Sequence, residues 1–234
     1  MTFPLIKNAT FGTKLLTFAL LLIFGLAFSI VLGTIITIIN GSDLQDLKNL
    51  QITQIISGVV GFLMPAVVYA MLVQEKPWIY LGFNKIPLWS LLGIVAMFTV
   101  IPFLSMVTDW NNSISFPESM SAIEEQMRSL QASSEEVIKL LIGQGSLFSS
   151  LIIIAALAAI SEELLFRSVI QQALIKIFRN AHPAIIMTAI IFSAFHLDFF
   201  GFFPRAILGL MLGYMFWMSG SIIPSMLMHF LNNA

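Results

Sequence analysis

The sequence predicts an all-α membrane protein, a polytopic transmembrane helical bundle of about seven spans, or eight if one more helix crosses. Two observations predict this class. Of 234 residues, 58% are hydrophobic and only 10% are charged, whereas ordinary globular domains carry about 25% charged residues. The apolar residues also recur in long runs with helical periodicity, and a helix satisfies all of its own backbone hydrogen bonds in lipid.

Composition also limits the function. The net charge is −1, which argues against a nucleic-acid partner because such proteins need a basic surface. The chain has no cysteine, so disulfides, thiolate metal ligands and cysteine nucleophiles are all excluded.

Residues 1–108 predict three N-terminal spans. The apolar runs cover residues 15–39, 52–73 and 88–107, and each is close to the length of about 20 residues that a span needs. The first run is too long for a secretory signal and no small-residue cleavage site follows it, so it is expected to be retained. Polar loops are expected at residues 40–51 and 74–87, and Pro65 is expected to kink the second span.

Residues 109–145 form a connecting segment with a different composition. Its apolar residues keep helical spacing while acidic residues fill the remaining positions, which predicts one or two amphipathic helices on the membrane surface. A solvated acidic loop is the alternative. The charged residues are Asp109, Glu118, Glu124, Glu125, Glu135 and Glu136, against Arg128 and Lys139.

Residues 146–234 predict four further helices, which complete a single membrane domain over residues 1–234. They are expected at residues 146–178, 183–196 and 204–220, and from the turn before Pro224 to the end of the chain. The first of the four would be roughly 48 Å long, against a bilayer core of about 30 Å, so it must tilt, protrude or break.

Lysine and arginine residues occur in alternate connections, which predicts the orientation. By the positive-inside rule the N-terminus is cytoplasmic and, with seven spans, the C-terminus is outside. The absence of extended tails and glycosylation-type loops favours a bacterial inner membrane. The residues concerned are Lys7, Lys14, Lys76, Lys85, Lys176 and Arg179.

Two adjacent carboxylates and an arginine interrupt the apolar run of the fourth predicted span. Glu162, Glu163 and Arg167 have no charged neighbours between residues 151 and 175. Because ionised groups in hydrocarbon cost several kcal/mol each, they mark a functional site by default. Glu163 and Arg167 are four residues apart and share a helix face, so a purely structural ion pair is the alternative for these two.

Two more polar pairs follow on the next helices. Phe192 and His196 share one helix face, and His229 and Asn233 share another. Glu162 and His196 are equally far along the chain from Arg179, so an antiparallel hairpin that turns there would bring them to the same depth. The alternatives are packing histidines, a core phenylalanine and a frayed polar terminus.

Carboxylates, imidazoles and a carboxamide that converge in a low-dielectric cavity are suited to amide hydrolysis. A glutamate can take a proton from water, a histidine can orient that water or protonate the leaving nitrogen, and a carboxamide can stabilise the oxyanion. Glutamate and histidine are also usual zinc ligands, so the same groups could instead hold zinc.

These motifs resemble the CAAX prenyl protease and bacteriocin-processing family, also called CPBP or Abi. The family pattern is Glu-Glu-x-x-x-Arg, Phe-x-x-x-His and His-x-x-x-Asn on successive membrane helices. The matching positions are Glu162, Glu163, Arg167, Phe192, His196, His229 and Asn233.

The resemblance implies an intramembrane endopeptidase that cuts a membrane-associated peptide or protein. It implies that Glu162 activates water with His196, and that His229 and Asn233 stabilise the oxyanion. Glu163, Arg167 and Phe192 would support the site. Metal-free and metal-dependent mechanisms are both described for the family, so no cofactor is certain. If zinc is bound, its expected ligands are Glu162, His196 and His229.

Two other functions use the same polar cavity. A non-catalytic membrane binding or immunity protein could hold a peptide or partner there without cleaving it. A proton-coupled transporter would also explain buried carboxylates and histidines, but the first half of the chain shows no inverted repeat.

Overall fold

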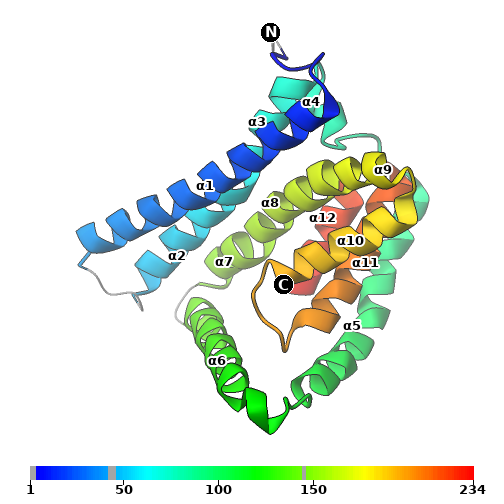
Figure 1. The fold of residues 1–234 in the computed structure, drawn as a ribbon. Helices are drawn as coiled ribbons and strands as arrows, with labels where there is room; N and C mark the ends of the chain where they lie inside the picture. The colour runs from blue at the N-terminus through cyan, green and yellow to red at the C-terminus, as the bar shows by residue number, and fades with distance from the viewer. Residues whose placement is uncertain (1–3, 42–45, 144–145) are drawn as a thin grey trace.

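The computed structural model describes residues 4–41, 46–143 and 146–234, and every regular element within them is a helix. In Figure 1 the N-terminal helices lie beside those of the second half, and α6 closes one end of the arrangement. Five helices are long and apolar enough to cross a membrane. The predicted all-α class and multi-pass membrane character are therefore confirmed.

The predicted count of seven or eight spans is not confirmed. The five candidate spans are Phe11–Ile39, Leu47–Val73, Leu88–Asn112, Leu147–Phe178 and Phe202–Ser219. The other two predicted spans are α10 (Ala181–Ala194) and α12 (Ile222–Asn233), which hold 14 and 12 residues. These lengths correspond to roughly 21 Å and 18 Å, less than a bilayer core of about 30 Å. α12 is largely buried in the bundle, whereas α10 buries one face and exposes Ile186, Met187 and Ile190 on the other.

The first two spans form an antiparallel hairpin. α1 (Phe11–Ile39) is capped by Thr10, whose side chain accepts a hydrogen bond from the backbone of Thr13. α2 (Leu47–Ile56) begins five residues earlier than the predicted second span, so the polar loop is shorter than expected. Residues 42–45 of that predicted loop lie outside the described residues.

A π-helical turn, Ser57–Leu63, joins α2 to α3 (Met64–Val73). The irregularity of this span therefore lies upstream of Pro65, whose missing N–H would break a regular ladder. α1 approaches closely at Gly25, where a Cβ atom would lie 2.6 Å from the Pro65 ring. A side chain at Gly25 would force the two helices apart.

The third span is longer than predicted. A short helix, α4 (Pro77–Tyr80), precedes a 3-10 turn (Leu88–Ser90) and α5 (Leu91–Asn112). α5 packs against α11 and α12. At its far end Asn111 is fully buried.

The connecting segment contains one helix, α6 (Ser121–Gly143), after a 3-10 turn. It is helical as expected, and Leu141 is its buried residue. Its first turns are held by Arg128, whose guanidinium lies 4.0 Å from the centre of the Phe200 ring and donates to the Ile114 carbonyl at 3.2 Å. Residues 144–145, at the end of the predicted segment, lie outside the described residues.

The fourth span is a continuous helix of 32 residues, Leu147–Phe178. Two π-helical turns lie on either side of its central α-helical part, α8. It ends at Arg179, which adopts the left-handed conformation with φ 53°. Its parts are α7 (Leu147–Ser150), the turn Leu151–Leu157, α8 (Ala158–Leu165), the turn Phe166–Gln171 and α9 (Gln172–Phe178).

Among the last three helices, α10 packs against α9 and α11 (Phe202–Ser219), α11 and α12 pack against α5, and α12 also packs against α8. Gly209 lets α11 approach α10, since a Cβ atom there would lie 3.1 Å from Ala189. Gly220, with φ 63°, ends α11 and permits the tight turn into α12. The predicted fifth helix is wrong at its end: α10 stops at Ala194, so His196 lies in the following turn.

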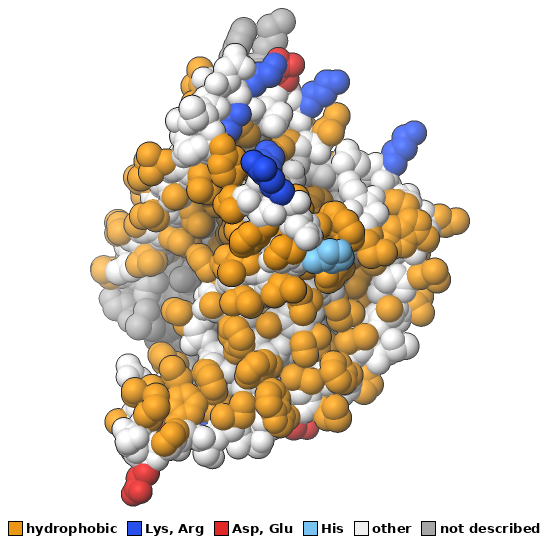
Figure 2. All heavy atoms as spheres, turned by 45° about the vertical axis from the view of Figure 1, so that its right-hand side comes forward, with side chains coloured by type: hydrophobic (Ala, Val, Ile, Leu, Met, Phe, Trp, Pro, Cys, Tyr) orange, Lys and Arg blue, Asp and Glu red, His pale blue; other side chains and the backbone are white. Residues whose placement is uncertain are grey.

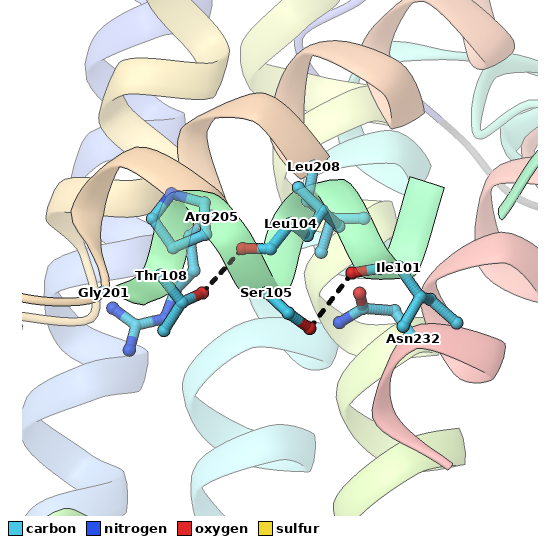
Figure 3. Close-up of a pocket in the computed structure, with 9 residues that line it drawn as sticks. Ile101, Leu104, Ser105, Thr108, Gly201, Arg205, Leu208 and Asn232 are labelled. Atoms are coloured by element: carbon cyan, nitrogen blue, oxygen red, sulfur yellow. Dashed lines mark hydrogen bonds between the residues drawn. The ribbon is translucent and has the colours of Figure 1, made fainter. Parts of the chain in front are cut away.

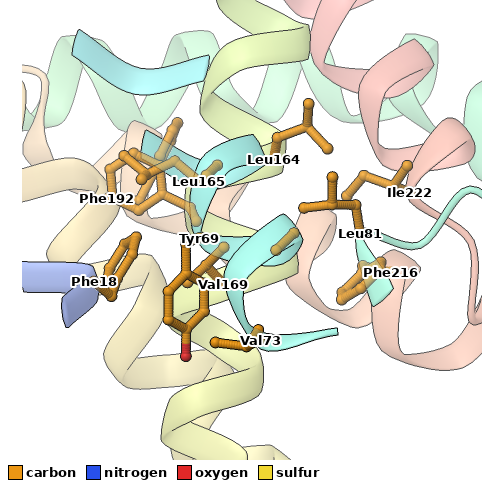
Figure 4. Close-up of a cluster of buried hydrophobic side chains, with 13 residues drawn as sticks. Phe18, Tyr69, Val73, Leu81, Leu164, Leu165, Val169, Phe192, Phe216 and Ile222 are labelled. Atoms are coloured by element: carbon orange, nitrogen blue, oxygen red, sulfur yellow. The ribbon is translucent and has the colours of Figure 1, made fainter. Parts of the chain in front are cut away.

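The largest hydrophobic cluster joins the N-terminal hairpin to the second half (Figure 4). Phe18 and Tyr69 from the hairpin contribute to the same cluster as Leu164, Leu165 and Phe192. Glu162 and Glu163 directly precede Leu164 and Leu165 in α8. The cluster therefore fixes the rotation of α8, which decides where its two carboxylates point.

Candidate active site

Glu162 and Glu163 face different surroundings because consecutive helical residues are rotated by about 100°. The Glu162 side chain is 18% exposed and lines a cavity of about 360 Å³. The Glu163 side chain is fully buried. One carboxylate can therefore meet water and substrate, while the other belongs to the protein interior.

Glu163 joins α8 to α12. Its Oε2 lies 3.1 Å from Arg167 Nε one turn later, and both side chains are fully buried. Its Oε1 lies 3.1 Å from His229 Nδ1. Since a carboxylate oxygen accepts, His229 donates through Nδ1–H, and in the neutral imidazole Nε2 then keeps its lone pair.

His229 Nε2 lies 3.8 Å from Glu162 Oε2. The two glutamates thus lie at opposite nitrogens of one imidazole. Glu163 fixes the orientation of the His229 ring, and Glu162 lies on the side of that ring that faces the cavity. The structure brings these three predicted residues together as the motif pattern requires.

Phe192 separates the two histidines. Its ring centre lies 5.2 Å from that of His196 and 5.8 Å from that of His229, edge to face in both cases. The Arg167 guanidinium lies 4.8 Å from the centre of the same ring. A buried cation over an aromatic face is stabilised, so Phe192 supports the ion pair as well as the spacing of the imidazoles.

His196 lies in the turn after α10, exposed to the cavity. Its Nδ1 is 3.0 Å from the Phe192 carbonyl oxygen, which can only accept. His196 therefore donates through Nδ1–H and presents Nε2 as a base or ligand. The next residue, Leu197, adopts φ 52°, a conformation that is rare for non-glycine residues and concentrates at functional sites.

Asn233 is the last residue of α12, one turn after His229. It lines the cavity beside Asn232, whose Nδ2 donates to Asn233 Oδ1 at 3.1 Å. The Asn233 amide group keeps its own N–H donors for another acceptor. A frayed polar terminus was the alternative interpretation of this end of the chain, and the structure shows that Asn232 lines the cavity and donates a hydrogen bond to Asn233.

The cavity collects residues from distant parts of the chain. Glu162, His196, His229 and Asn233 share it with side chains from α2, α6, α11 and the π-helical turn Leu151–Leu157. The further polar lining residues are Gln54, Ser134, Asp198, Arg205 and Asn232.

Arg205 and Asp198 are site residues that the sequence analysis did not single out. Arg205 Nη2 pairs with Asp198 Oδ2, and Asp198 Oδ1 accepts from the backbone of Phe200 at 3.0 Å and of Gly201 at 3.2 Å. The pair holds the loop that follows His196. Their sequence signal was available, because they are the only Asp, Glu, Lys or Arg residues after Arg179.

A second cavity of about 310 Å³ adjoins the first between α5 and α11 (Figure 3). Arg205, Leu208 and Asn232 line both cavities. On the α5 side, Ser105 and Thr108 donate their hydroxyl protons to carbonyls of their own helix. These two hydroxyl groups can therefore only accept hydrogen bonds from a molecule that binds in this cavity.

The predicted zinc ligands Glu162, His196 and His229 all line the cavity. Among the described residues, no group of three or more His, Cys, Asp or Glu side chains is close enough as arranged to hold a metal ion. The hydrogen bond from His229 Nδ1 to Glu163 leaves Nε2, 3.8 Å from Glu162 Oε2, available as a ligand. The zinc site therefore stays a prediction.

The helices that supply this site resemble a known family. Residues 144–234 match the family model of the Rce1-like type II CAAX prenyl endopeptidases. This segment is similar to the Rce1-like family. The match confirms the resemblance that the three motifs predict, and it supports a protease at the level of the family. No curated protein and no solved structure matches the chain.

The Rce1-like segment contains all seven motif residues. It contributes α7 to α12, whereas Gln54 of α2 and Ser134 of α6 reach the cavity from outside it. The N-terminal helices and α6 therefore complete the walls of a cavity whose polar centre is Rce1-like.

Proposed function

We propose that this protein is an intramembrane endopeptidase that hydrolyses a peptide bond of a membrane-associated peptide or protein. One observation carries the proposal. Glu162 faces the cavity 3.8 Å from the Nε2 atom of His229, an imidazole whose other nitrogen is held by the buried Glu163. A structural ion pair would not need a second carboxylate on the open side of the ring.

In the proposed reaction, Glu162 takes a proton from a water molecule in the cavity. The water oxygen attacks the substrate carbonyl carbon, and negative charge develops on the carbonyl oxygen. His196 orients the water by accepting a hydrogen bond at Nε2. Glu162 then gives its proton to the leaving nitrogen as the C–N bond breaks.

The oxyanion needs hydrogen-bond donors. Asn233 supplies an amide N–H, and a single donor of this kind typically contributes about 3 kcal/mol. His229 supplies a second donor in its protonated form, in which Nδ1–H remains bonded to Glu163 and Nε2–H faces the cavity. Arg167 neutralises Glu163 and so keeps the support of the ring intact.

We further propose that this chemistry runs without a tightly held metal, because every step above is assigned to a side chain. The expected partners are a peptide or membrane-anchored protein substrate and the lipid bilayer, with no nucleic acid. The expected setting is a bacterial inner membrane with the N-terminus in the cytoplasm.

The test replaces Glu162 with Gln, which keeps the shape of the side chain and removes the base. Purified protein in lipid nanodiscs is incubated with a mixture of peptides, and the products are identified by mass spectrometry. Wild-type protein should cleave at defined bonds, and Glu162→Gln should lose this activity at an unchanged melting temperature. Glu118→Gln, at an exposed acidic residue near α6, is the matched control.

The same experiment separates the other candidate functions. If Glu162→Gln cleaves as well as wild type does, the proposed mechanism is wrong. If neither protein cleaves any peptide but both bind peptides equally, the cavity belongs to a non-catalytic binding protein. Substrate-dependent proton uptake into sealed vesicles without cleavage would indicate a transporter.

A further inference from the structure

The two ends of the helix bundle differ in charge. Figure 2 shows several blue Lys and Arg side chains in its upper part, with a red acidic group beside them, and red acidic side chains without blue ones at its lower edge. Six of the eleven Lys and Arg residues lie at one end, two for each of three connections. They are Lys7, Lys14, Lys76, Lys85, Lys176 and Arg179.

Contacts between segments show that these connections lie together. The backbone N–H of Ile6 donates to the Leu72 carbonyl at 3.0 Å, which places the N-terminus beside the end of α3. Ile222 N–H donates to the Gly82 carbonyl at 2.8 Å, which places the turn between α11 and α12 at the same end. We call this the basic end.

The opposite end is held together by a separate set of contacts. Asn111, at the end of α5, donates to the Phe199 carbonyl at 3.2 Å and accepts from Phe203 N–H at 3.0 Å. Gln51, near the start of α2, lies 3.4 Å from Ser149 in α7. This acidic end therefore contains the start of the second and fourth spans, the end of the third, and α6.

The catalytic cavity lies toward the acidic end. Gln54 comes from the first half of the second span, Ile153 from the first half of the fourth, and Asn233 from the last residue of α12. Asp198 comes from the loop between α10 and α11. None of the described residues before α1, between α3 and α5 or between α9 and α10 lines the cavity.

The path from the cavity to the basic end is closed. After Glu162, α8 and the following π-helical turn present Leu165, Phe166 and Val169, none more than 1% exposed. Ser168 in the same stretch donates to the Leu81 carbonyl. At the acidic end, in contrast, Ser134 of α6 both lines the cavity and is exposed to solvent.

We infer that the catalytic cavity opens on the extracytoplasmic side of the membrane, beneath α6. Connections rich in Lys and Arg are retained in the cytoplasm, and six such residues at the basic end stand against four at the acidic end. On the basis of the proposed function, the substrates are peptides, or segments of membrane-anchored proteins, that are exposed outside the cytoplasm.

Because the chain contains no cysteine, single cysteines can report the side directly. Ser134→Cys marks the cavity mouth, and Lys85→Cys marks the basic end. Intact cells are treated with a membrane-impermeant maleimide, and labelling is compared with that after permeabilisation. Ser134→Cys should be fully labelled in intact cells, whereas Lys85→Cys should be labelled only after permeabilisation.

Other labelling patterns contradict the inference. Labelling of Lys85→Cys but not Ser134→Cys in intact cells would show that the cavity faces the cytoplasm. Equal labelling of both from one side would show that the two ends are not on opposite sides. Neither result depends on peptidase activity.

A second measurement links the mouth to the substrate. A bulky maleimide on Ser134→Cys should block cleavage of peptides added to right-side-out vesicles, while the same reagent on Glu135→Cys should block less. Glu135 is exposed and does not line the cavity. If the labelling pattern is as expected but no peptide is cleaved from either side, the cavity does open outside the cytoplasm and the proposed peptidase function is wrong.

Discussion

His229 Nδ1 lies 3.1 Å from Glu163 Oε1 in the interior of the bundle, where the His229 side chain is 3% exposed and the Glu163 side chain is fully buried. The contact joins the fourth span to the last helix. It makes Glu163 a residue that orients an imidazole, and it leaves Glu162 as the carboxylate that faces the cavity.

Replacing Glu163 with Gln should destabilise the protein. The change leaves Arg167 buried without its counter-charge, and breaking a buried ion pair costs about 3–5 kcal/mol. Thermal unfolding in detergent should show a clear fall in Tm. The double variant Glu163→Gln, Arg167→Met should recover part of this loss, because no uncompensated charge remains. Equal Tm values for all three proteins would contradict the ion-pair role.

Two substitutions at His196 should separate the functions of its nitrogens. His196→Asn can keep the hydrogen bond to the Phe192 carbonyl but has no group at the Nε2 position. We expect unchanged Tm and a fall in kcat of roughly 10²- to 10⁴-fold, as is typical for the loss of a proton-handling group. His196→Gln should retain more activity than His196→Asn, since its amide reaches the Nε2 position. The reverse order would assign the important contact to Nδ1.

Asn233 and Asn232 provide a matched pair. Asn233→Ala should lower kcat by roughly 10²- to 10³-fold with little change in KM, because an oxyanion donor acts in the transition state. Asn232→Ala should have a much smaller effect, since this residue contacts Asn233 and the cavity wall. Steady-state kinetics on one cleavable peptide measures both. A larger fall in kcat for Asn232→Ala than for Asn233→Ala would mean that Asn232, and not Asn233, is the oxyanion donor.

Chelation should not change the activity. Because the proposed steps use side chains only, 1,10-phenanthroline should leave kcat/KM unchanged, and elemental analysis of the purified protein should find no stoichiometric zinc. Loss of activity that is restored by added zinc would overturn the metal-free mechanism. A variant such as His196→Asn should then also lose the bound metal.

The docking of α6 should depend on pH. The Phe116 backbone N–H, which donates to Glu124 at 2.8 Å, and the Arg128 guanidinium lower the pKa of Glu124 below its usual value of about 4.5. A lowered folded-state pKa means that the stabilisation is fully present above the unfolded pKa and is lost as pH falls through the folded one. Amide protection factors in the first turns of α6 should therefore drop below about pH 4.5. Glu124→Gln should remove this step.

Much of the fold follows from local patterns. Apolar runs predict the long helices, and Thr10 and Asp46 provide caps where helices begin. The helical spacing in the connecting segment correctly favours α6 over a loop. Helix ends are less well predicted: α10 stops before His196, because the turn is set by contacts such as Asp198 with the Phe200 backbone.

Hydropathy alone does not predict the number of membrane spans correctly. α10 is a short apolar helix of 14 residues, and α12 holds only 12. Burial among other helices and burial in lipid both select apolar side chains, so composition does not distinguish a span from a helix that is too short to cross the bilayer.

The sequence by itself determined that this is a helical membrane protein with seven motif residues in three separate segments, because periodicity and the high cost of charges in lipid are local properties. The tertiary structure decided which glutamate faces the cavity. It also recruited Asp198, Arg205 and Asn232, and placed Gln54 and Ser134 in the walls. These placements depend on the rotation and packing of helices that are distant in the chain, and no local pattern encodes them.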